Sequence, residues 1–293
     1  MKYIFKSLIL ISFVFFVYYL YQYDYAAIPT VKSYPLLVLS LTVLLIGFIL
    51  QGEAWGRILR SYNFTTLHHD GLVSIGLSIL GKYMPGKIGM IVGPSSFLAK
   101  KYSFSFIKVS CISVGYQFIS IIAGLLLGVI GLFYIRSQYA MEVLCLLVAM
   151  TLFISPLLKK LCYKIPVLSK ISNQITLEFK QFKEIFLWFV SFWLFWCGGF
   201  LLFSMSLYPE NDQYIAIFFA FAVAGAIGIL SVISPGGIGV REGIITIYLI
   251  NIGFEQSVAI TLAVVSRLWF LIGEVLFFIL SLLIYYSSSF NKG

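Results

Sequence analysis

The chain has 293 residues, of which 61% are hydrophobic and only 11% are charged. A soluble globular domain carries charge on about a quarter of its residues, so this composition excludes that class and predicts an all-α polytopic membrane protein. The formal net charge of +9 does not indicate a nucleic-acid partner, because the lysines cluster beside apolar runs, where anionic lipid is their natural counterion.

Two apolar segments come first in the chain. Residues 8–20 follow Lys2 and Lys6 and precede an aromatic rim. No small-x-small cleavage site follows directly, which favours an uncleaved first span over a signal peptide. Residues 36–50 form the next predicted span, which ends near Trp55 at the predicted cytoplasmic face.

The loop at residues 57–70 is predicted to be cytoplasmic, because it begins with two arginines. It also contains His68, His69 and Asp70. Adjacent histidines point in different directions on most backbones, and no further ligand stands at a useful spacing. We therefore interpret this stretch as a solvated loop and not as a metal or catalytic cluster.

Residues 72–99 form the first of two broken apolar segments. Pro85 and Gly86 interrupt it, and Lys82 and Lys87 flank this break. Basic residues also stand before and after the whole segment. The pattern predicts a re-entrant hairpin that enters the membrane from the cytoplasm and returns there.

Three more spans and a basic segment follow. Residues 107–134 are a predicted span with Gln117 in its interior, and residues 139–158 return. Residues 159–183 carry six lysines against one glutamate, so we expect this segment along the inner headgroups, partly as an interfacial helix. Residues 186–207 then cross outward to a short acidic loop.

The second broken segment covers residues 214–252 and contains Ser-Pro-Gly-Gly-Ile-Gly-Val-Arg-Glu-Gly from position 234. Proline has no N–H to donate and glycine tolerates positive φ, so a helix over 216–232 should stop here and restart near Val240. In hydrocarbon the freed backbone must be buried in protein or line a wet cavity, and the restarted helix offers N–H groups to an anion. The last span, 257–286, is predicted to return to the cytoplasm.

The two breaks share one pattern. Residues 85–93 and 235–243 both read PGxIGxxxG, displaced by 150 positions. We therefore interpret the single membrane domain 1–293 as two related halves, about 1–135 and 136–293. This predicts about six full spans plus two re-entrant hairpins, one from each side, in a pseudo-inverted repeat. The alternatives are about eight plain spans, or a chance recurrence of the common Pro-Gly loop signal.

Four ionisable residues are predicted to lie at membrane depth, all of them in the second half: Arg241, Glu242, Arg267 and Glu274. A charge at the centre of a membrane helix costs about +2.5 to +3.5 kcal/mol, so each is a functional candidate. One interpretation is structural, with Arg241 paired with Glu242 or Glu274 to hold the fold. The other is a cationic pocket for a phosphate headgroup, built from Arg241, Arg267 and a helix N-terminus, with Gln117 at the place equivalent to Arg267.

The stretch from Ser234 to Gly243, followed by Arg267, closely resembles the second-half signature of flippase-like membrane proteins related to the transmembrane region of lysylphosphatidylglycerol synthases. Lys82-Tyr83-Met84-Pro85-Gly86-Lys87-Ile88 is similar to the first-half signature. The resemblance implies a lipid-handling membrane protein, with the following residues at its site: Pro235, Gly236, Gly237, Gly239, Arg241, Glu242 and Arg267.

The chain departs from this family's pattern at two positions. Pro94 stands where an arginine is common after the first motif, and Gln117 stands near the place of a frequent carboxylate. The larger synthases also carry a soluble aminoacyl-transferase domain that these 293 residues do not contain, so aminoacylation of lipid by this chain alone is not expected. We add Lys82, Lys87 and Gln117 to the predicted headgroup site, with Pro85 and Gly86 as the first break.

The leading hypothesis is a lipid flippase that binds an anionic or phosphate-containing lipid and translocates it across a bacterial or archaeal cytoplasmic membrane. Both termini are predicted to be cytoplasmic. The alternative is a non-transporting partner of a glycosyltransferase or polysaccharide-assembly enzyme, docked through residues 159–183. No catalytic residues, metal or cofactor are expected, because DxD, HxxxxD and HExxH motifs are absent.

Overall fold

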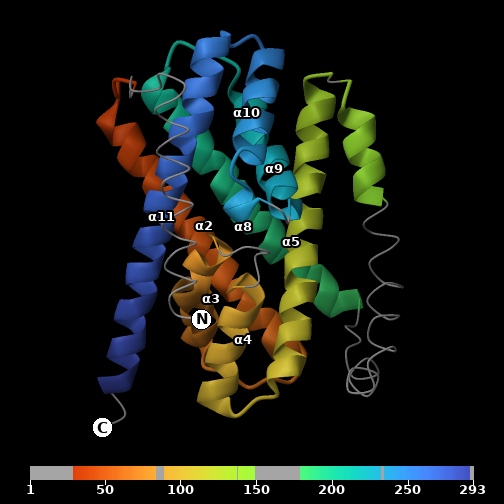
Figure 1. Ribbon diagram of the computed structural model, residues 1–293, viewed down its shortest axis with the longest axis vertical. Coiled ribbons are helices and arrows are strands. Elements are labelled where there is room, and N and C mark those ends of the chain that lie inside the picture. Colours follow the sequence, from red (N-terminus) through yellow and green to blue (C-terminus); the bar gives the residue numbers. More distant parts are fainter. Residues whose placement is uncertain (1–28, 84–88, 137, 149–178, 232–233, 291–293) are drawn as a thin grey trace.

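The computed structural model describes residues 29–83, 89–136, 138–148, 179–231 and 234–290, and every regular element in these ranges is helical (Figure 1). Three predictions lie outside the described residues: the first span at 8–20, the first break with Pro85, Gly86 and Lys87, and most of the lysine-rich segment.

Four of the described helices are long and apolar enough to cross a membrane. They are α2 (Tyr34–Ser61), α5 (Phe106–Tyr134), α8 (Phe179–Leu207) and α11 (Gln256–Phe290). They contain the predicted spans at 36–50, 107–134, 186–207 and 257–286. The predicted span at 139–158 lies only partly within the described residues, of which 140–148 are helical.

Between these long helices lie two pairs of shorter helices. The first pair is α3 (His68–Ser78) with the 3₁₀ turn η1 (Ile79–Tyr83), and α4 (Gly89–Tyr102). The second is α9 (Tyr214–Leu230), the turn η3 (Pro235–Gly237) and α10 (Val240–Asn251). The two pairs occupy opposite halves of the long axis, and η1 and η3 contact each other between them (Figure 1).

The break between α9 and α10 lies where the glycines and the proline predict it. Gly236, Gly237 and Gly239 have φ angles of 61°, 75° and 83°. Side chains with a Cβ rarely adopt such angles, so these positions favour glycine. The predicted helix stop and the predicted restart at Val240 are therefore confirmed.

Helix α2 runs antiparallel to α8, and the two helices pack against each other along their length. Backbone N–H groups of Lys32 and Ser33 donate to the carbonyl of Ser206 at one end, and Arg57 binds Glu184 at 2.7 Å at the other. Between these ends, aromatic rings fill the core, as where Phe48 packs on Trp196, Phe270 and Phe277. Rings in such pairs add to stability beyond their buried area.

The predicted cytoplasmic loop at 57–70 is wrong in its extent. Helix α2 continues to Ser61, and α3 already begins at His68. In the last turns of α2, Glu53 pairs with Arg57 at 3.0 Å and with Arg60 at 2.8 Å. These ion pairs along one helix support the last turns of α2.

Candidate functional site

The tip of the first hairpin is bound to the last long helix. Tyr83 of η1 donates a hydrogen bond of 2.8 Å from its hydroxyl to Glu274 Oε2, and Lys82 Nζ forms an ion pair with Glu274 Oε1. Glu274 is 1% exposed on α11. A carboxylate buried this deeply needs such partners, because an unpaired charge in a low-dielectric interior is strongly destabilising.

The tip of the second hairpin is bound to the same helix. Arg267 on α11 donates from Nη2 to the carbonyl of Gly236 at 2.8 Å, and its guanidinium lies 5.6 Å from the ring of Tyr83. Its Nε also faces Glu242 Oε1 at 3.7 Å. Arg267 therefore contacts elements of both hairpins, η1 and η3.

Glu242 is engaged by its own helix. Its Oε2 accepts a hydrogen bond of 2.6 Å from the backbone N–H of Gly239, just before the first turn of α10. A carboxylate at this place complements the helix dipole and satisfies one free donor. The N–H groups predicted to await an external anion are thus partly occupied by the chain itself.

Arg241 has neither of its predicted carboxylate partners. Its guanidinium carbon lies 4.1 Å from the ring centre of Phe221 and 4.3 Å from that of Phe270. The residue is 6% exposed, and its Nε and Nη2 atoms make no hydrogen bond. The prediction that Arg241 pairs with Glu242 or Glu274 to hold the fold is therefore wrong, because these carboxylates face other groups.

A cavity of about 90 Å³ lies beside Arg241. This is several times the volume of about 10–15 Å³ that one water molecule needs. Its wall comes from both halves of the chain and combines charged, neutral polar and aromatic side chains. Those that matter for binding are Gln51, Ser78, Lys82, Tyr116, Gln117, Ser120, Trp193, Trp196, Phe221, Arg241, Phe270 and Glu274.

The charged side chains around the cavity do not balance. Among the described residues, the cations are Arg241, Arg267 and Lys82, whereas the carboxylates are Glu242 and Glu274. One positive charge is left over. The unbalanced cation is Arg241, since the other two each face a carboxylate.

Residues 3–277 match the family described as the lysylphosphatidylglycerol synthase TM region. The chain belongs to this family. The resemblance stated from the sequence motifs is thereby confirmed, and the lysylphosphatidylglycerol synthase TM region family identifies a multi-pass membrane protein with a lipid-related function. No curated protein and no solved structure matches the chain.

In this member of the lysylphosphatidylglycerol synthase TM region family, most of the predicted site residues come together. Gly236, Arg241, Lys82 and Gln117 line one cavity. Arg267, Glu242, Gly237 and Gly239 adjoin it through η3 and the start of α10, where the backbone of Pro235 also lies. Lys87, Pro85 and Gly86 lie outside the described residues.

Sequence reasoning missed several residues of the site. Tyr83 could have been found, since it stands next to Lys82 within the first motif. Phe221 and Phe270 could not, because one phenylalanine among 28 carries no signal of its own until packing places it against a guanidinium.

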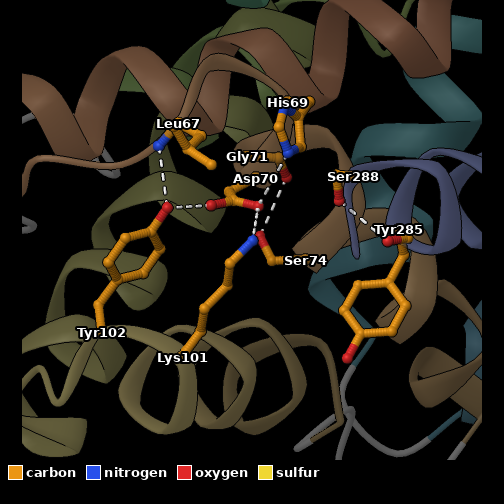
Figure 2. Close-up of polar contacts among 9 residues, drawn as sticks. All are labelled: Leu67, His69, Asp70, Gly71, Ser74, Lys101, Tyr102, Tyr285 and Ser288. Atoms are coloured by element: carbon orange, nitrogen blue, oxygen red, sulfur yellow. Dashed lines mark hydrogen bonds and ion pairs between the residues drawn. The ribbon is translucent and has the colours of Figure 1, made fainter. Parts of the chain in front are cut away.

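A second polar cluster lies at the base of the first hairpin and corrects the interpretation of His68, His69 and Asp70 as a solvated loop. These residues open α3, and Asp70 is fully buried. Figure 2 shows its carboxylate between Lys101 and Tyr102 of α4, with an ion pair of 2.6 Å to Lys101 Nζ and a hydrogen bond from the Tyr102 hydroxyl. His69 Nε2 lies 3.6 Å away.

This cluster joins the two arms of the first hairpin. The Tyr102 hydroxyl also accepts a hydrogen bond of 3.0 Å from the backbone N–H of Leu67, which ties α4 to the start of α3 (Figure 2). Partial burial, followed by the bond to Asp70, raises the pKa of Tyr102 above its usual value. The cluster therefore fixes the base of the hairpin, whereas Lys82 and Tyr83 fix its tip.

Proposed function

We propose that the chain binds the phosphate-containing headgroup of an anionic membrane lipid at Arg241 and translocates that lipid across the membrane. The observation that carries this proposal is the state of Arg241, which is buried, lines a cavity and has no carboxylate partner. The headgroup would occupy the cavity while the acyl chains remain in the bilayer.

The physical reason is the cost of an uncompensated buried charge. Removing a cation from water costs several kcal/mol, of the order that breaking a buried ion pair costs, about 3–5 kcal/mol. Stacking on Phe221 and Phe270 offsets part of this, since a desolvated cation–π contact contributes about 2 kcal/mol. A phosphate would supply the missing negative charge, and the planar guanidinium suits two parallel hydrogen bonds to its oxygens.

The arrangement of the elements supports movement of the headgroup between two sides. Each half has a long helix, a broken pair and a second long helix. The last long helix of the first half, α5, packs on α9, which opens the broken pair of the second half. In the same way the last long helix of the second half, α11, packs on α3, which opens the broken pair of the first half. We propose that the halves form an inverted repeat, with each broken pair re-entrant from its own side, an arrangement found in many transporters.

The cavity lies where the proposed repeats meet. Four pairs of its lining residues are displaced by the same 150 positions as the sequence motif: Ile75 and Gly225, Ser78 and Gly228, Ile79 and Ile229, and Ser120 and Phe270. A binding site shared by equivalent positions of both halves can open toward either side by similar movements.

We further propose that the chain is not an enzyme. Glu242 and Glu274, the two carboxylates of the site, are each engaged by a cation and a hydrogen-bond donor, so neither is placed as a free general base. The non-transporting alternative was predicted from residues 159–183, most of which lie outside the described ranges, so the transport assay must separate the two.

The test uses the purified chain in vesicles that contain a trace of acyl-labelled phosphatidylglycerol, whose inner-leaflet fraction is read by chemical quenching from outside. We expect Arg241→Met to lower the translocation rate at least tenfold while the thermal midpoint stays equal or rises, because an apolar side chain replaces an unpaired charge. Arg136→Gln is the matched control, since Arg136 is an exposed arginine outside the site.

Translocation by Arg241→Met at the wild-type rate would contradict the proposed site. No translocation by the wild-type chain above empty vesicles would contradict the transport function and favour the non-transporting partner.

A further inference from the structure

Part of the cavity wall consists of neutral hydrogen-bonding groups. Gln51 on α2 and Gln117 on α5 line it together with Ser78 and Ser120. The Tyr116 hydroxyl donates to the backbone carbonyl of Gln51 at 3.4 Å, and the side-chain Oε1 atom of Gln51 is buried without a hydrogen-bond partner among the described residues. Amides and hydroxyls both donate and accept, so this wall matches the hydroxyl groups of a ligand.

No carboxylate of the described site is left to receive an ammonium group. Glu274 already accepts from Lys82 and Tyr83, and Glu242 accepts from the N–H of Gly239 and faces Arg267. A cationic headgroup placed here would find no free anion.

The aromatic faces next to the cations are also engaged. Arg241 lies over Phe221 and Phe270, and Lys82 Nζ lies 4.8 Å from the centre of the Phe270 ring. An ammonium group would therefore compete with the chain's own cations for these rings. It would also add to a site that already holds an excess positive charge, where the low dielectric makes like charges repel strongly.

We infer that the headgroup is a phosphodiester with an uncharged, hydroxylated substituent, such as glycerol or a sugar, and that headgroups with a free amine are rejected. This inference rests on the proposed function. The phosphate would neutralise Arg241, and the hydroxyl groups would bond to Gln117 and Gln51. The headgroup would occupy the cavity beside Arg241, whose lining includes all of these side chains.

The test compares translocation rates of four lipids with the same labelled acyl chains in vesicles containing the wild-type chain. Phosphatidylglycerol carries hydroxyls, phosphatidylmethanol is the matched phosphodiester without them, and phosphatidylethanolamine and lysylphosphatidylglycerol carry amines. We expect phosphatidylglycerol to move at least tenfold faster than either amine lipid, and about fivefold faster than phosphatidylmethanol, the effect of roughly one hydrogen bond.

Gln117→Leu provides a readout that a purely structural role would not give. It should reduce the ratio of the phosphatidylglycerol rate to the phosphatidylmethanol rate from about five to about one, because only the hydroxylated ligand uses the amide. Gln51→Leu should act in the same direction.

Two sets of results separate this inference from the function on which it rests. If Arg241→Met is inactive but amine lipids move as fast as phosphatidylglycerol, the headgroup class is wrong and the phosphate site stands. Equal rates for phosphatidylmethanol and phosphatidylglycerol would show that the glycerol hydroxyls make no hydrogen bonds to the neutral side chains. These side chains would then be hydrated, and the proposed hydroxyl contacts would be wrong. Uptake of soluble glycerol 3-phosphate at a comparable rate would show that the ligand is a free phosphate ester and not a lipid headgroup.

Discussion

Arg241 and Glu274 are two kinds of buried charge within one site. Glu274 has a cation and a hydroxyl donor, whereas Arg241 has only aromatic faces. The sequence predicted that both residues matter, since ionisable groups in apolar helices are costly. It could not predict their partners, because adjacent positions such as 241 and 242 point to different neighbours once helices pack.

At the residue scale, we expect Glu274→Gln to destabilise the protein by about 3 kcal/mol, because it leaves Lys82 without its carboxylate. Lys82→Met combined with Glu274→Gln should recover much of this loss. Denaturation of the two single variants and the double variant in detergent gives the coupling free energy. Additive effects of the two substitutions would show that the pair contributes nothing to stability.

The two broken pairs of helices differ in how far their elements could be predicted. The break between α9 and α10 follows from Pro235 and the glycines after it, because helix termination there is a local backbone property. The start of α3 could not be predicted, since a stretch of two histidines and an aspartate appears solvated until α4 supplies Lys101 and Tyr102 to bury Asp70. Local sequence signals therefore predicted the helix end that backbone conformation determines. They did not predict the helix start that depends on tertiary contacts.

At the scale of the element, Gly236→Ala and Gly243→Ala form a matched pair within the second motif. A Cβ at Gly236 would lie 2.7 Å from Arg267 Nη2 and 2.9 Å from the Tyr83 ring, at a φ of +61°. We expect Gly236→Ala to lower both translocation and the thermal midpoint. Gly243 lies in α10 with open space around its Cβ position, so alanine there should be neutral or stabilise by up to about 1 kcal/mol.

This comparison is measured by the vesicle assay and by thermal unfolding in detergent. Equal behaviour of the two variants would mean that the close approach of η3 to Tyr83 and Arg267 has no role in function.

At the scale of the molecule, the sequence repeat predicted the order of elements in both halves. Residues of both halves were assigned to one headgroup site because of their charged and amide side chains. The repeat itself gives equivalence and not proximity, since a displacement of 150 positions says nothing about distance in space. The contact between η1 and η3 supplies that proximity. Residues such as Gln51 and Trp196 enter the wall from α2 and α8, outside both motifs.

The proposed inverted repeat predicts opposite access to equivalent positions. We expect Ile79→Cys and Ile229→Cys, each in a chain whose four native cysteines are alanine, to react with a membrane-impermeant thiol reagent from opposite sides of the vesicle membrane. Phosphatidylglycerol should slow both reactions. Reaction of both positions from the same side alone would argue against the inverted arrangement.

The pairing of α2 with α8 has a consequence for the conditions in which the protein works. The ion pairs at its ends, Lys32 with Glu210 and Arg57 with Glu184, are exposed, so each contributes at most about 1 kcal/mol and weakens in salt. Helix packing between these ends does not depend on charge. The pairing of α2 with α8 should therefore persist from dilute media to brine.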